Sequence, residues 1–337
     1  MTGPTGSMLL VNAHLELSAE QRESWSTAWP GLRVVNSDAA SAERLDGRGI
    51  TFLVTQSVPE DLTMWPDLRW VQLLSAGADQ VLGHPVLNTE IPVTTASGIH
   101  SVPIAQFVTG TWLAMAHRLP DLMGFKQSRV WPDRVALSAF TVRGLTVGIL
   151  GYGAIGRECA RQLSGLGMRV LCAKNDPLRR RDTHYNAWPG TGDPEGELPE
   201  EWFGPDQLDS MLPQCDLLVV TAPSTPSTVG MLGERELKLL KQGARVIVVS
   251  RGGIVDEAAL AAALRSGRIA EAVVDCYTVE PPPPSHPFFD LANLVMTPHM
   301  SGVYDGSRSA MAALIGENLR RLRAGEPLLN RVGAGGY

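Results

Sequence analysis

The stretch "LTVGILGYGAIG", residues 145–156, runs from a near-continuous apolar segment directly into three spaced glycines. Such an apolar run is typical of a strand that is buried on both faces of a parallel sheet. Gly151, Gly153 and Gly156 would then allow a tight turn, a close approach of backbone to a pyrophosphate, and close packing of the next helix on the strand. The N–H groups and the dipole at the start of that helix favour an anion. The stretch predicts a dinucleotide-binding turn; the alternative is a glycine-rich turn without a ligand.

Short apolar runs alternate with helix-like segments along nearly the whole chain, which is the pattern of α/β folds with mainly parallel sheets. A first unit extends to about residue 100, and a long helix over residues 101–120 ends at Pro120. Ser18 and Gln21 form a predicted capping box at the first helix. The predicted strands are 8–15, 32–37, 50–57, 68–79, 91–98, 145–150, 169–173, 216–223, 244–250, 271–277 and 293–299.

The composition is that of an ordinary globular protein. A length of 337 residues favours two domains, and a net charge of −6 gives no support to nucleic-acid binding. No apolar stretch approaches the roughly 20 residues that span a bilayer, and the beginning lacks the pattern of a signal peptide. The four cysteines have no CxxC spacing, so we expect buried free thiols, no metal site, and a reducing, cytoplasmic setting.

Residues 177–206 interrupt the alternation of strands and helices. They are rich in proline, glycine and charged residues, with aromatic residues mixed in. This composition is typical of an exposed loop, so we predict an insertion on the surface.

Charged side chains gather at the ends of the later strands. Arg251 directly follows one strand, Asp275 lies at the end of the next, Glu280 precedes a proline run, and His299 follows the last strand. In open parallel sheets, ligands bind beyond the carboxyl ends of the strands. We therefore expect these side chains to converge near the reactive end of the dinucleotide.

The chemistry of these residue types is complementary. An arginine holds a carboxylate with two hydrogen bonds and polarises a neighbouring carbonyl. A histidine exchanges the proton that accompanies hydride transfer, and a carboxylate bonded to it orients the ring and favours its charged form. Each residue alone has a commoner explanation: a surface ion pair for Arg251, a solvated carboxylate for Glu280, a structural role for His299. Together, behind a nucleotide turn, they indicate a catalytic set.

The motifs "GYGAIG", "VSRGGIVDE", "VVDCYTVEPPPP" and "TPHMSG" stand in the order and spacing of one family. By these motifs the sequence resembles the D-isomer-specific 2-hydroxyacid dehydrogenases over nearly its whole length. The resemblance matches Arg251, Glu280 and His299 to the catalytic residues of that family. It matches Asp275 to an acid near the nicotinamide. The cofactor contacts that follow are Gly151, Gly153, Ala154, Ile155, Gly156, Lys174, Asn175, Thr221, Ala222, Pro223, Ser250, Asp275 and His299.

The resemblance also implies a substrate loop and a domain arrangement. The segment "LLSAGAD" matches a loop whose backbone N–H groups bind the substrate carboxylate, at Ala76, Gly77 and Ala78. The fold would comprise two Rossmann-like or flavodoxin-like α/β domains with parallel sheets, the cofactor domain being inserted into the substrate domain. The substrate domain would span 1–102 and 303–337, with the last apolar helix, and the cofactor domain 103–302. Residues 103–143 correspond to an arm that forms homodimers, and Trp131 would reach the partner.

Lys174 departs from the family pattern, because an Asp usually ends the second strand of the cofactor domain. A lysine there, with the neutral donor Asn175, favours a 2′-phosphate, so we predict NADP(H) as the preferred cofactor with NAD(H) as the alternative. The arginines at 179–181 would complete a phosphate pocket. The competing interpretation is a solvated basic loop, with Asp176 holding the ribose of NAD. His100, in the crossover, is a substrate contact, a residue of the hinge packing or a surface group.

We conclude from the sequence that the chain reversibly reduces a small 2-keto acid to the D-2-hydroxy acid. Two alternatives remain open. One is a dinucleotide-sensing interaction protein like the C-terminal-binding corepressors, which would need an exposed peptide groove on the first domain. The other is a dehydrogenase of an unusual substrate such as phosphite, which the same arginine and histidine would serve.

Overall fold

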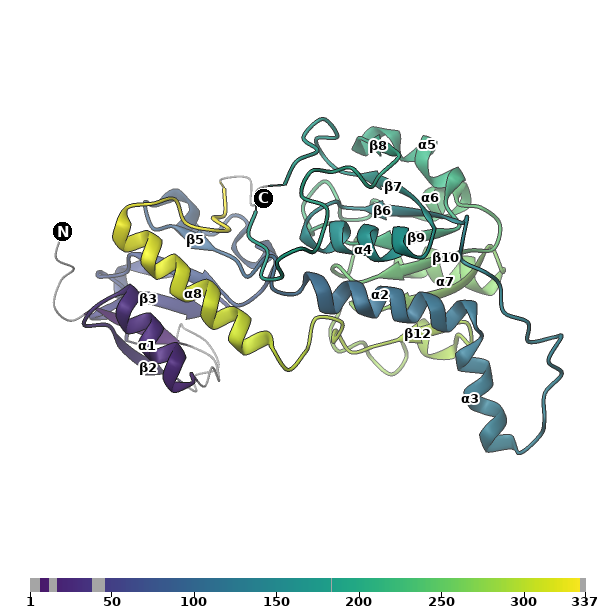
Figure 1. The fold of residues 1–337 in the computed structure, drawn as a ribbon, viewed down its shortest axis with the longest axis horizontal. Helices are drawn as coiled ribbons and strands as arrows, with labels where there is room; N and C mark the ends of the chain where they lie inside the picture. Colours follow the sequence, from purple (N-terminus) through teal and green to yellow (C-terminus); the bar gives the residue numbers. More distant parts are fainter. Residues whose placement is uncertain (1–6, 12–16, 38–45, 183, 334–337) are drawn as a thin grey trace. The chain divides into compact units, whose positions relative to one another are not determined.

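The structure is a computed structural model that describes residues 7–11, 17–37, 46–182 and 184–333. The chain divides into two compact units. The first consists of residues 1–100, 184–189 and 304–337, and the second of residues 101–183 and 190–303. Each unit is built around its own parallel sheet, of five and seven strands (Figure 1). The predicted α/β class with two parallel sheets is therefore confirmed.

The first unit has the strand order β2-β1-β3-β4-β5, with every neighbouring pair parallel. This is the order of flavodoxin-like folds. Its strands are β1 (Met8–Val11), β2 (Arg33–Asn36), β3 (Ile50–Thr55), β4 (Trp70–Leu73) and β5 (Val93–Thr94), and its helices are α1 (Ala19–Ala28) and α8 (Ser307–Ala324). Beyond Val11, the first predicted strand falls at residues 12–15, outside the described residues.

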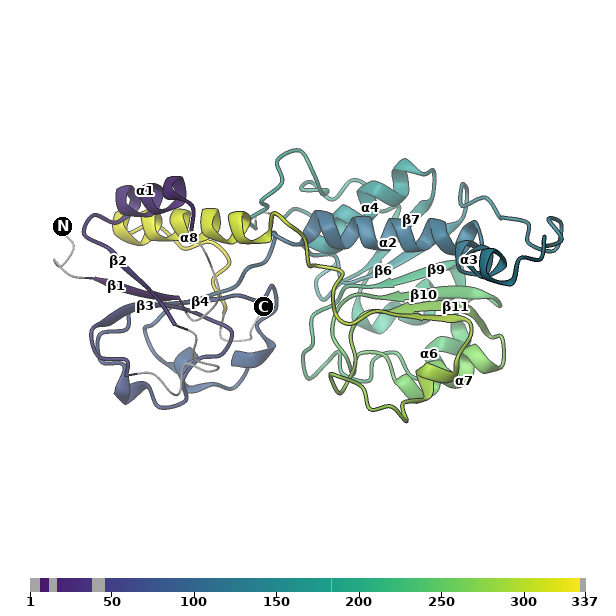
Figure 2. The same cartoon turned by 90° about the horizontal axis from the view of Figure 1, so that it is seen from below.

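The two faces of the first sheet bury different side chains, because successive residues of a strand point to opposite faces. Figure 2 shows α1 and α8 together on one face, although they come from the two ends of the chain. The fully buried Trp25 of α1 donates its Nε1–H to the carbonyl of Ala312 in α8 at 2.8 Å. The C-terminal helix thus belongs to the core of the first unit. Ser18 and Gln21 form the predicted capping box of α1.

The second unit has the strand order β12-β11-β10-β9-β6-β7-β8, again parallel throughout. Figure 2 shows α2 and α4 on one face of this sheet and α6 and α7 on the other. The strands are β6 (Thr146–Leu150), β7 (Arg169–Ala173), β8 (Glu201–Phe203), β9 (Leu217–Val220), β10 (Ala244–Val248), β11 (Ile269–Val274) and β12 (Leu294–Met296). The helices are α2 (Ser101–Ala116), α3 (Leu119–Ser128), α4 (Ala154–Gly165), α5 (Leu208–Met211), α6 (Glu234–Leu239) and α7 (Glu257–Arg265).

The order of the second sheet reverses between β6 and β9. Read outward from β6, the chain adds β7 and β8 on one side and β9 to β12 on the other. Such a switch point is where doubly wound sheets bind dinucleotides. The glycine-rich turn follows β6 directly, so the fold places it at the point where a cofactor is expected.

Two details of the sequence analysis are wrong. Pro120 does not end the long helix: α2 stops at Ala116, Arg118 takes a left-handed conformation (φ 56°), and Pro120 stands in the first turn of α3. Proline fits there because the first N–H groups of a helix have no intrahelical partner. The insertion at 177–206 is not only a surface loop, because β8 extends the sheet beside β7 and Asp193 is buried.

Candidate active site

The glycine turn after β6 has the backbone geometry that a dinucleotide requires. Gly151 has a φ of 95°, and a Cβ there would lie 2.5 Å from the backbone of Ala222. A Cβ on Gly156 would lie 2.2 Å from the carbonyl oxygen of Gly151. Both positions therefore require glycine. The turn also contacts the loop after β9, because the Thr221 hydroxyl donates to the Gly151 carbonyl at 2.6 Å.

Gly153 is different, and it shows where a ligand fits. It is the N-cap of α4 without a side-chain hydrogen bond, and a Cβ on it would meet no protein atom within 4 Å. A Cβ on Gly153 would thus lie in open space at the start of α4, where the first N–H groups of a helix have no intrahelical partner and can bind an anion. The residues present fit the pyrophosphate of a dinucleotide.

The histidine predicted to exchange the proton and the carboxylate predicted to orient it lie in direct contact within the second unit. His299 Nδ1 lies 2.9 Å from Glu280 Oε2 and 3.0 Å from Glu280 Oε1. The side chains are 43% and 38% exposed, so the pair is accessible to a substrate. Glu280 also accepts the N–H of Tyr277 at 2.9 Å. With Nδ1 bonded to the carboxylate, the opposite ring nitrogen, Nε2, is left to exchange a proton.

A buried acid braces the loop that carries His299. Asp275, 1% exposed, accepts the Thr297 hydroxyl at 2.6 Å and the N–H groups of Met300 and Ser301 at 2.8 and 2.9 Å. His299 itself has a φ of 51°, a conformation that few non-glycine residues adopt and that its surroundings must impose. The bonds to Asp275 on both sides of His299 supply that constraint.

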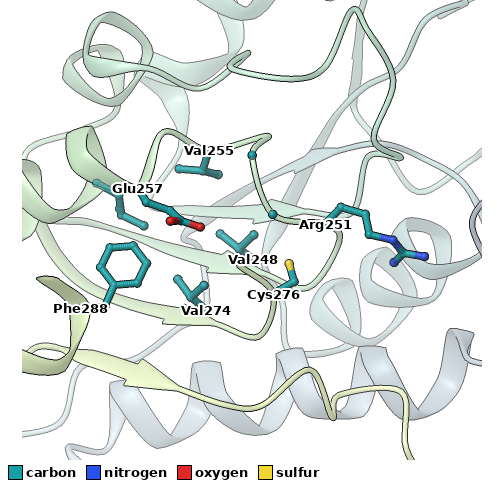
Figure 3. Close-up of a pocket in the computed structure, with 10 residues that line it drawn as sticks. Val248, Arg251, Val255, Glu257, Val274, Cys276 and Phe288 are labelled. Carbon is teal, nitrogen blue, oxygen red and sulfur yellow. The ribbon is translucent and has the colours of Figure 1, made fainter. Parts of the chain in front are cut away.

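Arg251 follows β10 at the same sheet edge. Its Nη1 donates to the Ser250 carbonyl at 2.9 Å, and its side chain is partly buried. Figure 3 shows the guanidinium pointing away from the small apolar pocket below its loop, which Val248, Val274 and Phe288 line. Burial raises the pKa of the neighbouring Cys276 thiol to about 12, so that this thiol stays protonated.

Lys174, which is predicted to bind a 2′-phosphate of the cofactor, directly follows β7. Lys174 is half-buried, and its Nζ donates to the Arg179 carbonyl at 3.0 Å. Burial, and then the charge of Arg157, lower its pKa. The Asp176 carboxylate accepts the N–H groups of Leu178 and Arg179 at 3.0 and 3.3 Å, and thereby caps the turn.

Two of the three following arginines have partners within the insertion. The Arg180 guanidinium lies 5.8 Å from the centre of the Trp202 ring, and Arg181 forms an ion pair with Glu195 at 3.0 Å. Arg179 is exposed. Among the described residues, neither Lys174 nor Arg179 forms a salt bridge. They are the cations nearest in sequence to the end of β7, where the ribose is predicted to bind.

Sequence reasoning missed the residues that hold the insertion against α4. Arg157, 2% exposed, forms an ion pair with Asp182 at 3.2 Å and donates to the Arg180 carbonyl at 2.6 Å. The Tyr152 hydroxyl donates to Asp193 at 2.7 Å. An arginine on the dinucleotide helix and a tyrosine between the motif glycines were the available signals, since both interrupt an otherwise small or apolar pattern.

The substrate loop and His100 belong to the first unit. Ala78 is fully buried, while Ala76 and Gly77 are partly exposed after β4. Gln80 and the Gly77 carbonyl both bond the Ser75 hydroxyl, at 2.6 and 2.7 Å, which fixes the loop. The His100 ring packs edge-on against Tyr304 with the ring centres 6.3 Å apart.

Comparison with known proteins agrees with this geometry. Residues 109–301 match the profile of the D-isomer specific 2-hydroxyacid dehydrogenase NAD binding domain. The chain belongs to the D-isomer specific 2-hydroxyacid dehydrogenase family. A glyoxylate reductase of Thermococcus gammatolerans is 31% identical over 305 residues, covering 88% of this chain and 86% of that one. A glyoxylate reductase of Korarchaeum cryptofilum is 29% identical over 326 residues, covering 96% and 91%.

Solved structures of the family superimpose on nearly the whole chain. A D-isomer specific 2-hydroxyacid dehydrogenase of Xanthobacter autotrophicus, in complex with NADPH and MES, has a TM-score of 0.80 at 31% identity, covering 98% of this chain and 100% of that one. An NADPH-dependent glyoxylate/hydroxypyruvate reductase of Sinorhizobium meliloti, with NADP and sulfate, has a TM-score of 0.78 at 25% identity, covering 98% and 100%.

Membership in this family confirms the predicted enzyme class. The protein is an NAD(P)-dependent oxidoreductase that interconverts 2-keto acids and 2-hydroxy acids. None of the helices in the described ranges is both long enough and apolar enough to cross a lipid bilayer. The four cysteines, all within those ranges, are buried free thiols as predicted.

Proposed function

We propose that the protein is an NADPH-preferring reductase of small 2-keto acids such as glyoxylate and hydroxypyruvate, and that Arg251, Glu280 and His299 are its catalytic residues. The observation that carries the proposal is the contact of the His299 imidazole with both oxygens of Glu280. Relatives named glyoxylate reductase support the substrate class.

The chemistry of reduction divides among these side chains. The reduced nicotinamide, when bound, supplies the hydride. Arg251 binds the keto-acid carboxylate in a two-pronged contact and polarises the carbonyl beside it. His299 gives a proton to the carbonyl oxygen as the alcohol forms, and Glu280 orients the ring and favours its protonated state. The backbone N–H groups at Ala76, Gly77 and Ala78 would add donors for the substrate carboxylate.

The cofactor would lie along the sheet edge from Gly151 to His299. The turn at Gly151, Gly153 and Gly156 would hold the pyrophosphate, with Ala154 and Ile155 giving their N–H groups. Thr221, Ala222 and Pro223 would contact the cofactor between its pyrophosphate and its nicotinamide. Ser250 and Asp275 would lie near the nicotinamide. These assignments agree with the position of the turn at the switch point of the sheet.

The preference for NADPH follows from the end of β7. Lys174, next to Asn175, supplies a cation where a 2′-phosphate would lie, and Asp176 already accepts two N–H groups of its own turn. Structures of relatives that contain NADPH and NADP support this choice.

We also propose that the protein is a cytoplasmic homodimer. The segment from α3 to residue 143 extends away from the rest of the second unit (Figure 1). It exposes Met123, Val130, Trp131 and Val135, each by 66% or more. Exposed apolar side chains gathered on one projecting segment are typical of an interface. Four buried free thiols suit a reducing compartment.

The catalytic assignment is tested with purified variants and a panel of 2-keto acids. His299→Ala should lower kcat by a factor on the order of 10²–10⁴ and leave the Kd of NADPH nearly unchanged. Arg251→Lys keeps the positive charge but loses the two-pronged guanidinium contact with the substrate carboxylate, so it should raise the KM for the keto acid sharply. Near-parental turnover of His299→Ala, or an unchanged KM of Arg251→Lys for every keto acid, would contradict the assignment.

A further inference from the structure

The loop that carries Glu280 is held at two points by one acid outside the proposed catalytic set. Glu257, the first residue of α7, accepts the Thr278 N–H at 2.7 Å and the Thr278 hydroxyl at 3.0 Å through Oε1. Its other oxygen, Oε2, lies 3.0 Å from Nε2 of His286. Thr278 precedes Glu280 and His286 follows it, so Glu257 joins the two sides of the loop.

In the contact of Glu257 with His286, the donor and the acceptor can be assigned. His286 Nδ1 accepts the N–H of Phe288 at 3.4 Å, which leaves the ring proton on Nε2 in the neutral form. Nε2–H therefore donates to Glu257. The imidazole is 12% exposed and the Glu257 side chain 19%, and the ring packs edge-on against Phe288 with centres 4.7 Å apart. The contact is thus largely shielded from solvent.

The same loop also touches the loop that carries Arg251. A Cβ on Gly252 would lie 2.0 Å from the carbonyl carbon and oxygen of Tyr277, so the two backbones are in direct contact. The N–H of Tyr277 in turn binds Glu280 at 2.9 Å. Figure 3 shows the Glu257 carboxylate directed into the pocket beneath these loops, on the opposite side from the Arg251 guanidinium.

We propose that Glu257 is a positioning residue for the Glu280–His299 pair: by fixing Thr278 and His286, it sets the place of the Glu280 carboxylate against the imidazole. The inference rests on the proposed catalytic roles of Glu280 and His299. An acid in the first turn also stabilises a helix, but that role needs neither of the two contacts that Glu257 makes with the loop.

The test is the pH dependence of kcat for glyoxylate reduction with NADPH, in the parent and in Glu257→Gln. The amide oxygen keeps an acceptor for Thr278, but the amide NH₂ meets the Nε2–H of His286, donor against donor. Displacement of the loop should lower kcat by about ten- to a hundredfold. It should move the alkaline fall in kcat toward lower pH, in the direction expected for Glu280→Gln, because a displaced carboxylate no longer favours protonated His299.

A double variant separates positioning from a merely structural role. Glu257→Gln should add little to the loss of kcat in Glu280→Gln, because both act through one contact. The matched control is Glu271→Gln: Glu271 is an acid of the same unit that pairs with Arg245 at 2.8 Å and is 23% exposed. It should leave the pH profile of kcat unchanged.

A pair of His286 variants tests the same contact without changing Glu257. His286→Gln retains an N–H donor and should keep most of the parental kcat, whereas His286→Leu should resemble Glu257→Gln. This pair decides the question if Glu257→Gln does not fold. Additive losses in the double variant, or parental pH profiles in both Glu257→Gln and His286→Leu, would overturn the inference. Parental turnover of His299→Ala and Glu280→Gln would instead refute the proposed catalytic roles.

Discussion

Replacement of Lys174 should reverse or abolish the preference for NADPH. Lys174 directly follows β7, and its Nζ already donates to the Arg179 carbonyl at 3.0 Å, so the ammonium is held in place before a cofactor binds. Part of the entropy cost of ordering this long side chain is thereby met before the cofactor binds. In Lys174→Ala the ammonium is lost, while the neutral Asn175 and the exposed Arg179 remain.

The expected size follows from the strength of charged hydrogen bonds. Each contributes about 1.5–3 kcal/mol, and about 1.4 kcal/mol corresponds to a factor of ten. If Lys174 makes one such bond to the 2′-phosphate, Lys174→Ala should lower the ratio of kcat/KM with NADPH to that with NADH by about ten- to a hundredfold. Lys174→Asp should lower it further, because a carboxylate repels the phosphate and accepts from the ribose hydroxyls.

The pH dependence of this preference has a definite sign. Burial, and then the charge of Arg157, lower the pKa of Lys174 below its usual 10.5. The ammonium therefore loses its charge earlier as the pH rises, and the preference for NADPH should weaken in the alkaline range. An arginine stays protonated there, so the preference of Lys174→Arg should depend less on pH.

The assay is kcat/KM for one keto acid with each cofactor, and the ratio cancels effects on the chemical step. Lys238→Ala serves as the control, since Lys238 is an exposed lysine of the same unit that pairs with Glu234. A parent that uses NADH as well as NADPH would refute the reasoning. An unmoved ratio in Lys174→Ala would show that another residue reads the phosphate.

The other predictions concern the turn and the arm. Gly153→Ala should fold with a parental Tm, because a Cβ there meets no protein atom within 4 Å. The same variant should raise the Kd of NADPH at least tenfold, which corresponds to about 1.4 kcal/mol of binding free energy. Gly156→Ala should instead lower Tm, because its Cβ would lie 2.2 Å from the Gly151 carbonyl. An unchanged Kd in Gly153→Ala would argue against a pyrophosphate at this turn. Trp131→Ala combined with Val135→Ser should shift the protein toward monomer in sedimentation velocity, and an unchanged mass would exclude the arm as the interface.

The proposed catalytic residues were predictable because a simple rule places them. In a parallel sheet, residues that follow successive strands share one edge, and the apolar strands before Arg251 and His299 are clear in the sequence. The contact of His299 with Glu280 needed only that rule and the complementary chemistry of the two groups. The capping box at Ser18 and Gln21 was equally predictable, because it is local.

Contacts that depend on the path of a loop were not predictable. The short β8 (Glu201–Phe203) has no run of apolar residues, and it becomes a strand only because β7 offers it an open edge. Arg157 and Asp193 are distant in sequence, and their hydrogen bond requires the insertion to fold back onto α4. For the same reason nothing in the sequence paired Glu257 with His286.

Two acids support the half-exposed pair of Glu280 and His299, the proposed catalytic pair, and both are more deeply buried than the pair itself. Asp275, 1% exposed, fixes the loop of His299, and Glu257, 19% exposed, bonds both sides of the loop of Glu280. A carboxylate suits this task because its two oxygens accept several N–H and O–H donors at once, and charged acceptors bind more strongly than neutral ones. Asp275 directly follows β11 and Glu257 begins α7, so each of the two acids is anchored next to or within regular structure. The motifs "VVDC" and "VDE" therefore contain Asp275 and Glu257, the acids that would hold the proposed reacting groups in position, although those groups lie outside both motifs.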